Sequence, residues 1–354
     1  MKSIRRVITS VCLLVTTGLL VLAATQMTSA FFSFYPKLSR AALSFLAGIT
    51  SVIPYAVWEL LLIVLLLWFL VSLFVDICKG KILQWLSGLL LGASLAVFVF
   101  VGLWGLNYFA PSMASRLGLP EEKYTAAELR EATEYYRDRA NAAAALVERD
   151  GNGVMVAGNF DELAKAAGDG YEALAAEMEC FDGSTARVKH LLSSPLMGAN
   201  GTTGVFIAFT GESGVSSTTF SASIPFTMCH EIGHRMAFAR EDEANFAGFL
   251  SCMANDRPDF QYSGYYSAFI YCYNALYKVD PDAAAEVMAG ASDALCADLK
   301  ASIAHYDALE DETASEVQNK VYDAYLKTFA VESGVQSYGE VVDLLTTWYF
   351  EKLK

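Results

Sequence analysis

The sequence predicts two parts, an α-helical region embedded in a membrane and then a mainly α-helical domain of the α+β class. Three observations support this prediction. Residues 1–110 contain long apolar runs, the balance of charge reverses after them, and residues 111–354 combine helical patterns with one short β-rich stretch. We therefore divide the chain near residue 110 and consider the two parts separately.

Three apolar runs are long enough to cross a bilayer. Residues 7–27 and 82–106 contain no charged side chain, and residues 54–75 contain only Glu59. A bilayer core about 30 Å thick takes roughly 20 helical residues. A buried helix of a soluble domain keeps a polar stripe at this length, and these runs have none. We therefore expect three transmembrane helices and a lipid bilayer as a partner.

Basic residues predict the orientation in the membrane. One cluster, Lys2, Arg5 and Arg6, precedes the first run. The other, Lys79 and Lys81, lies in the link between the second and third runs. Such clusters stay in the cytoplasm, so three crossings leave residues 111–354 outside. The expected location is therefore a cell membrane, with a multi-pass anchor and an extracytoplasmic C-terminal domain. Residues 1–30 also fit a cleaved signal peptide, and this alternative leaves the domain outside as well.

The charge of the second part excludes one class of partner. The chain has 25 Lys and Arg against 39 Asp and Glu, a net charge of −14. Residues 1–110 hold seven basic and two acidic residues, so the acidic excess lies entirely in residues 111–354. A nucleic-acid-binding protein needs a basic face, so we expect no nucleic-acid partner.

Local signals predict several helices in the second part. Thr125 and Glu128 form a capping box that opens a helix through about Arg149. Residues 161–180 predict a second helical stretch, interrupted by two glycines. Pro225 and Pro281 each stand where a proline fits the first turn of a helix.

A small sheet is expected just before the helix that Pro225 opens. Residues 204–209 are rich in β-forming side chains. We predict a turn at residues 211–214, because glycines stand at both ends, and a second extended stretch at residues 215–220.

The chemistry is concentrated in the helix that follows. His230-Glu231-Ile-Gly-His234 is an HExxH pattern. Side chains four residues apart share a helix face, so His230 and His234 can bind one Zn²⁺. Glu231 points to the adjoining face, where it can accept a proton from metal-bound water. The chain has only 4 histidines, so two at this spacing around a glutamate argue for a zinc site.

A catalytic zinc site needs a third protein ligand and an open fourth position. Glu241 and Asn245 are four residues apart in a Glu-Asp-Glu-Ala-Asn run. This run resembles the Glu-x-x-Ala-Asp signature of gluzincin metallopeptidases. The resemblance implies Glu241 as the third ligand and Asn245, in place of the aspartate, as the residue that orients a ligand histidine. Glu243 remains an alternative third ligand. The second part is therefore expected to be a zincin-like metallopeptidase domain.

Motifs beyond the zinc signature resemble a bacterial membrane family catalogued as domain of unknown function 3810. They are Phe209-Thr-Gly-Glu212, the stretch from Pro225 to Phe246, Tyr325-Leu-Lys327, and Gly334-Val-Gln-Ser-Tyr338-Gly. With the three apolar runs, the resemblance covers essentially the whole chain. It implies a membrane-anchored, zinc-peptidase-like domain and implies no substrate. Family members tend to carry glycine where this chain has Ala237.

A zinc peptidase also needs a hydrogen-bond donor for the tetrahedral oxyanion. Tyr325, Tyr338 and His305 are the candidates. The aromatic run from Tyr262 to Tyr277 is expected to be a buried helix face, with a peptide groove as the alternative.

Two functions follow from these observations. The first is a membrane-anchored zinc metallopeptidase that hydrolyses peptide or protein substrates outside the cytoplasm, with water activated by zinc and Glu231. The alternative is a catalytically inactive zinc-binding domain that recognises peptides or acts as a sensor. The intact Glu231 favours the enzyme, because a purely structural site has no use for a base between its ligands.

Overall fold

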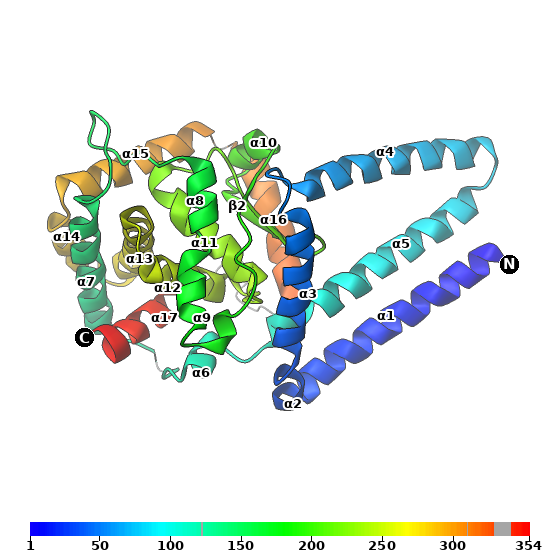
Figure 1. Ribbon diagram of the computed structural model, residues 1–354, viewed down its shortest axis with the longest axis horizontal. Coiled ribbons are helices and arrows are strands. Elements are labelled where there is room, and N and C mark those ends of the chain that lie inside the picture. Colours follow the sequence, from blue (N-terminus) through cyan, green and yellow to red (C-terminus); the bar gives the residue numbers. More distant parts are fainter. Residues whose placement is uncertain (122, 310, 329–340) are drawn as a thin grey trace.

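Three long helices project from a mainly helical body and pack along one another (Figure 1). The computed structural model describes residues 1–121, 123–309, 311–328 and 341–354. On the membrane side, the helices are α1 (Lys2–Gln26), α2 (Thr28–Phe32), α3 (Tyr35–Thr50), α4 (Val57–Cys78) and α5 (Ile82–Leu103).

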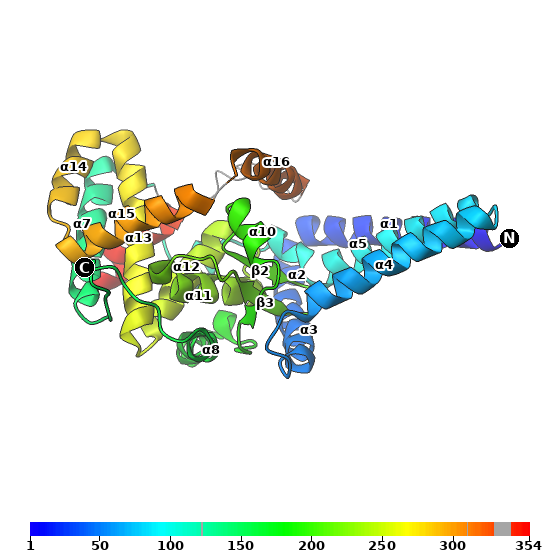
Figure 2. The ribbon, with the colours of Figure 1, turned by 90° about the horizontal axis from the view of Figure 1, so that it is seen from above.

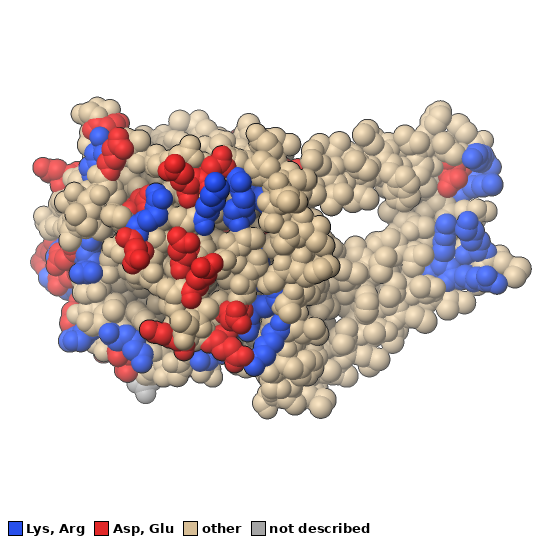
Figure 3. Space-filling view, in the orientation of Figure 1, with Lys and Arg blue, Asp and Glu red and all other residues tan. Residues whose placement is uncertain are grey.

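The predicted spans correspond to α1, α4 and α5. These helices have 25, 22 and 22 residues and are apolar enough to cross a membrane. Figure 3 shows basic side chains at the far end of the three helices and an uncharged surface between that end and the body. The far end is where the chain places its N-terminus and the α4–α5 link. The chain therefore has the apolar helices that membrane association requires.

The body is built mostly from helices, as the sequence predicts. In chain order the described ones include the 3-10 helix η1 (Gly105–Phe109), α6 (Met113–Leu117), α7 (Ala126–Ala144), α8 (Phe160–Ala166), α9 (Asp169–Ala175), α10 (Ser194–Ala199), α11 (Ile224–Arg235), α12 (Glu241–Ala254), α13 (Pro258–Val279), α14 (Pro281–Ala289), α15 (Asp293–Leu309), α16 (Glu312–Thr328) and α17 (Val341–Trp348). In the centre, α11 packs against α12, α13 and the sheet (Figure 2).

Helix boundaries follow the local signals closely. The capping box at Thr125 and Glu128 is formed, and α11 and α14 begin with proline in the first turn. The predicted extension of α7 to Arg149 is wrong. The Arg149 side chain turns back and donates to the carbonyl of Ala144 at 2.9 Å, which satisfies one of the free carbonyls at the helix end.

The predicted sheet has three strands in the order β1-β3-β2. They are β1 (Lys189–His190), β2 (Gly204–Ile207) and β3 (Glu212–Val215). β1 is parallel to β3, whereas β2 and β3 form an antiparallel hairpin with Val205 opposite Gly214. β2 is therefore one of the two edge strands, and it packs against α11.

Two details of the predicted hairpin are wrong. Residues 212–214 of the expected turn belong to strand β3, and extended structure ends at Val215 instead of continuing to residue 220. The chain turns before β3, because Gly211 has φ +66° and supplies the left-handed conformation. Gly214 instead lies within the strand, where a Cβ would come within 3.0 Å of the Leu191 side chain.

The segment between the first two spans belongs to the body. Helix α3 buries one side, including Tyr35, Leu43 and Ala47. Lys37 pairs with Glu179 at 2.5 Å, although residue 37 lies far before the sequence division at 110. The body therefore includes chain from both sides of that division.

Two carboxylates join the span α4 to the body. Glu212 of β3 accepts the backbone N–H groups of Val57 and Trp58, each at 3.0 Å. Glu59 of α4 accepts those of Leu192 and Ser193 at 2.7 and 2.8 Å. The first pair satisfies free donors at the N-terminus of α4, where negative charge is also favourable. These contacts fix the start of the span against the sheet.

Candidate metal centre

Helices α11 and α12 bring the predicted metal ligands together. His230 and His234 lie one turn apart on α11, and Glu241 is the first residue of α12. One ligand atom from each of the three residues lies within 4.8 Å of the others. The described part of the chain contains no second group of this kind.

The distances between the histidine nitrogens and the Glu241 oxygens are compatible with a shared metal ion. His230 Nε2 lies 3.3 Å from Glu241 Oε2, and His234 Nε2 lies 3.5 Å from Glu241 Oε1. Ligands about 2.0–2.1 Å from a tetrahedral Zn²⁺ are separated by roughly 3.3 Å. Both histidine–carboxylate distances are close to this separation, and the donor set of two imidazoles and one carboxylate suits zinc.

The turn between α11 and α12 orients His234. Its Nδ1 lies 2.9 Å from the carbonyl of Phe238, which leaves Nε2 for the metal. Ala237 in this turn has φ +69° and is the only described non-glycine residue with positive φ. Glycine suits that conformation best, which explains why a turn of this shape favours glycine at the position.

Electrostatics couple the three ligands. Burial raises the pKa of Glu241, but the two imidazoles outweigh burial and hold that pKa well below its usual range. Burial lowers the pKa of His234, but the Glu241 carboxylate outweighs it and raises the pKa to about 9. The ionised Glu241 therefore favours a positive charge beside it, which a metal ion would supply in place of the imidazole proton.

Glu231 lies beside the ligands with one oxygen unused. It is buried, and its Oε2 has no hydrogen-bond partner within the described residues. Burial raises the pKa of Glu231 to about 7, although both histidines lower it. A carboxylate with a pKa near neutrality and a free oxygen is suited to accept a proton.

A glycine in strand β2 makes room for the Glu231 carboxylate. A Cβ at Gly204 would overlap Glu231 Oε1 and come within 2.8 Å of Glu231 Cγ. Strand β2 therefore passes directly over the acid, as its sequence permits. Neither composition nor the HExxH spacing indicates this contact.

The alternative third ligand, Glu243, has other partners. It accepts hydrogen bonds from the backbone N–H of Met113 at 2.7 Å and from the guanidinium groups of Arg116 and Arg240. Burial raises its pKa, but the charges of Arg116 and Arg240 outweigh burial and keep it below the usual value. The structure therefore brings Glu241 to the histidines and uses Glu243 to attach α6 to α12.

Asn245 lies one helical turn after Glu241 but contacts a different partner from the expected one. Its Oδ1 accepts from the Tyr271 hydroxyl at 3.0 Å. Asn245 Nδ2 and His230 Nδ1 are both buried without a hydrogen-bond partner in the described chain. A ligand histidine is instead oriented by a backbone group, because His234 Nδ1 lies at hydrogen-bond distance from the Phe238 carbonyl.

Of the three candidate oxyanion donors, one lies at the site. Tyr325 of α16 lines the cavity, and burial raises its pKa to about 12. His305 is engaged elsewhere, with Nε2 2.7 Å from the carbonyl of Thr218. Tyr338 lies outside the described residues.

Tyr322 was not among the residues expected from the sequence, yet it donates a hydrogen bond to Glu241 Oε1. It lies three residues before Tyr325 and stacks against it, with ring centroids 6.0 Å apart. That spacing places both hydroxyl-bearing rings on one face of α16, a signal that the sequence contained.

A cavity of about 900 Å³ surrounds the metal group. Its wall combines distant parts of the chain, including Phe100, Trp104, Phe206, Tyr271, Tyr306 and Tyr325. The aromatic run of α13 is mostly buried, as expected, and also contributes Tyr266 and Tyr271 to this wall. A volume of this size holds several residues of an extended peptide.

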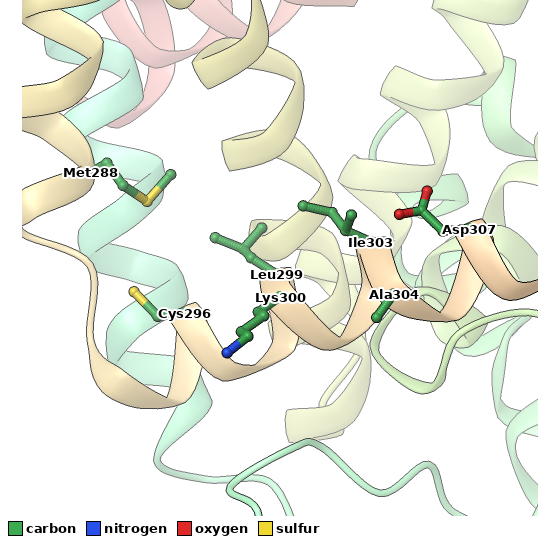
Figure 4. A pocket seen from close by; sticks show the side chains of 7 residues that line it. All are labelled: Met288, Cys296, Leu299, Lys300, Ile303, Ala304 and Asp307. Carbon is green, nitrogen blue, oxygen red and sulfur yellow. The ribbon is translucent and has the colours of Figure 1, made fainter.

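A second, shallower cavity lies against α14 and α15 and shares no residue with the first (Figure 4). Leu299, Ile303 and Met288 form its apolar surface. It contains none of the metal-ligand group, so the chemistry belongs to the larger cavity.

Fold and site together define a mainly helical protein with three membrane-type spans and a buried group that fits a metal ion. A family described as protein of unknown function (DUF3810) matches residues 33–346, and the chain belongs to this family. No curated protein and no solved structure matches the chain.

Proposed function

We propose that the protein is a membrane-anchored zinc metallopeptidase with a zincin-like domain outside the cytoplasm. One observation carries the proposal: three donors that all lie within 4.8 Å of one another stand beside a buried carboxylate that has a free oxygen. A structural zinc site is closed by four protein ligands, whereas a catalytic site keeps a position open. The His230, His234 and Glu241 group has three ligands, within a cavity large enough for a peptide.

The chain's own residues supply the remaining chemistry. Zinc held by the three ligands would polarise a substrate carbonyl and lower the pKa of bound water. Glu231 accepts a proton from the attacking water and returns it to the leaving amine. Tyr325 keeps its proton at neutral pH, because burial raises its pKa to about 12, so it can donate to the developing oxyanion.

The position of the basic side chains supports the orientation. They gather at the end of the spans farthest from the body (Figure 3). Because basic clusters remain in the cytoplasm, the body would lie on the opposite side of the membrane.

The test uses the full chain, because α3 and η1 form part of the body. Wild type, His234→Ala and Glu231→Gln are purified, loaded with zinc, and compared for zinc content and for cleavage of a peptide library by mass spectrometry. We expect wild type and Glu231→Gln to retain about one zinc per chain and His234→Ala to lose it. Only wild type should cleave peptides.

Other outcomes would redirect the proposal. A folded wild type that binds no zinc would contradict it. Zinc binding with no cleavage above the Glu231→Gln level would favour the inactive peptide-recognition or sensor domain instead.

A further inference from the structure

The cavity around the metal group reaches the membrane end of the body. Phe100 lies in the last turn of the span α5, and its ring is 5.7 Å from that of Trp104. The Trp104 ring is in turn 6.0 Å from the ring of His234. Two aromatic contacts therefore connect a residue of the span to a metal ligand, and both aromatic residues line the cavity.

The outer face of α3 indicates where the bilayer surface lies. Leu38, Phe45 and Ile49 are 60%, 69% and 57% exposed, opposite the side that packs on the body. Helix α3 crosses the junction between the spans and the body in both views (Figures 1 and 2). An amphipathic helix with this arrangement lies in the membrane interface with its apolar side toward the lipid.

Another exposed apolar residue lies beside the end of α5. Phe209, in the β2–β3 turn, is 47% exposed, and its ring lies 6.1 Å from that of Phe100. The apolar end of the cavity therefore faces the membrane, while Ser302 and Tyr306 line the same cavity on α15. A peptide extended through the cavity would have one end at the bilayer.

We infer that the substrate is a polypeptide cut just outside a membrane-embedded segment. The inference rests on the proposed peptidase function. An extended chain advances about 3.3 Å per residue, so the two ring contacts correspond to roughly three to five residues between the cut bond and the apolar segment. Hydrolysis adds one water across the C–N bond and leaves a carboxylate and an amine, so no other reactant is needed.

The experiment places the full-length zinc protein in liposomes with a matched pair of substrates. One is a sequence-randomised segment of about 30 residues, which reaches roughly 100 Å when extended. The other is the same segment joined, at either end, to an inert poly-leucine transmembrane helix. Mass spectrometry maps the cut positions, with Glu231→Gln as the inactive control.

We expect the cuts in the anchored segment to cluster within about five residues of the helix, and the free segment to be cut more slowly. Phe100→Ser should reduce the share of membrane-proximal cuts. Leu95→Ser is the matched control, since Leu95 is an exposed residue of the same helix that does not line the cavity. Zinc content confirms that both variants retain the site.

Evenly spread cuts, or equal rates for the free and anchored segments, would overturn this inference and leave the peptidase proposal intact. If wild type cuts neither segment above the Glu231→Gln level, the peptidase proposal fails and the inference fails with it.

Discussion

Trp104 donates its indole N–H to the backbone carbonyl of His234 at 2.9 Å. Trp104 is the residue at which the span α5 ends, and His234 is the second histidine of the metal group. A hydrogen bond across 130 positions of sequence therefore attaches the end of the apolar helix α5 to the helix that carries the two histidines. The end of this apolar helix is part of the wall of the cavity, through Phe100 and Trp104.

We expect Trp104→Phe to destabilise the protein by about 1 kcal/mol, because a buried hydrogen bond is lost while the aromatic ring remains. Trp58→Phe is the matched control, since the indole Nε1 of Trp58 has no partner in the described structure. Chemical unfolding in detergent measures both variants. Equal stability of the two would show that the contact with His234 has no energetic weight.

Replacing Glu241 and Glu243 one at a time should distinguish the residue that binds the metal from the residue that stabilises the fold. Glu241→Gln should lower zinc affinity at least tenfold, because the charged ligand between the histidines is lost. Glu243→Gln should retain zinc but unfold more easily, since Arg116 and Arg240 lose their carboxylate. Zinc titration and thermal unfolding measure the two effects. The reverse result would make Glu243 the ligand.

The ion pairs of Glu243 with Arg116 and Arg240 should also make the stability of the protein depend on pH. Its pKa in the folded state lies below the usual value, because Arg116 and Arg240 outweigh the effect of burial. The stabilisation is therefore fully present above the unfolded-state pKa of about 4.3 and is lost as pH falls through the lower folded-state pKa. Melting temperatures of wild type and Glu243→Gln should converge on acidification. A constant difference down to low pH would contradict this role.

Gly204→Ala should impair catalysis without removing the metal. The added Cβ would overlap the Glu231 carboxylate. The flexible Glu231 side chain can move aside, but its carboxylate then leaves the position beside the metal group. A displacement of about 1 Å can lower a rate as much as a hundredfold. Gly151→Ala is the control, because nothing lies within 4 Å of a Cβ there. Turnover per bound zinc is the measurement, and an unchanged value would show that Glu231 has another position available.

Two native cysteines test the orientation. Cys78, at the end of α4, and Cys296, on the body, are both exposed and unpaired. In intact cells, a membrane-impermeant maleimide should label Cys296 and leave Cys78 unlabelled until the membrane is opened. Cys78→Ser and Cys296→Ser assign the labelled peptides. Labelling of Cys78 alone would place the body in the cytoplasm.

Local sequence patterns determined the long apolar helices, several helix boundaries and the pairing of the two histidines. The apolar runs, the capping box at Thr125 and the four-residue spacing of His230 and His234 depend on neighbours in sequence, so their outcome is set by helix periodicity and local hydrogen bonding. The position of the hairpin turn was harder to predict from the sequence, because Gly211 and Gly214 both suit a turn. Packing of Gly214 against Leu191 decides between them.

Tertiary structure decided which acid meets the histidines and what surrounds them. Glu241 and Glu243 both stand in the first turn of α12, and sequence spacing alone leaves both as ligands. Met113 and Arg116, which precede them by more than 120 residues, occupy Glu243 and leave Glu241 for the metal group. Trp104 and Tyr322 reach the same site from distant segments. The physical reason is that such contacts depend on how whole helices pack, which no local pattern encodes.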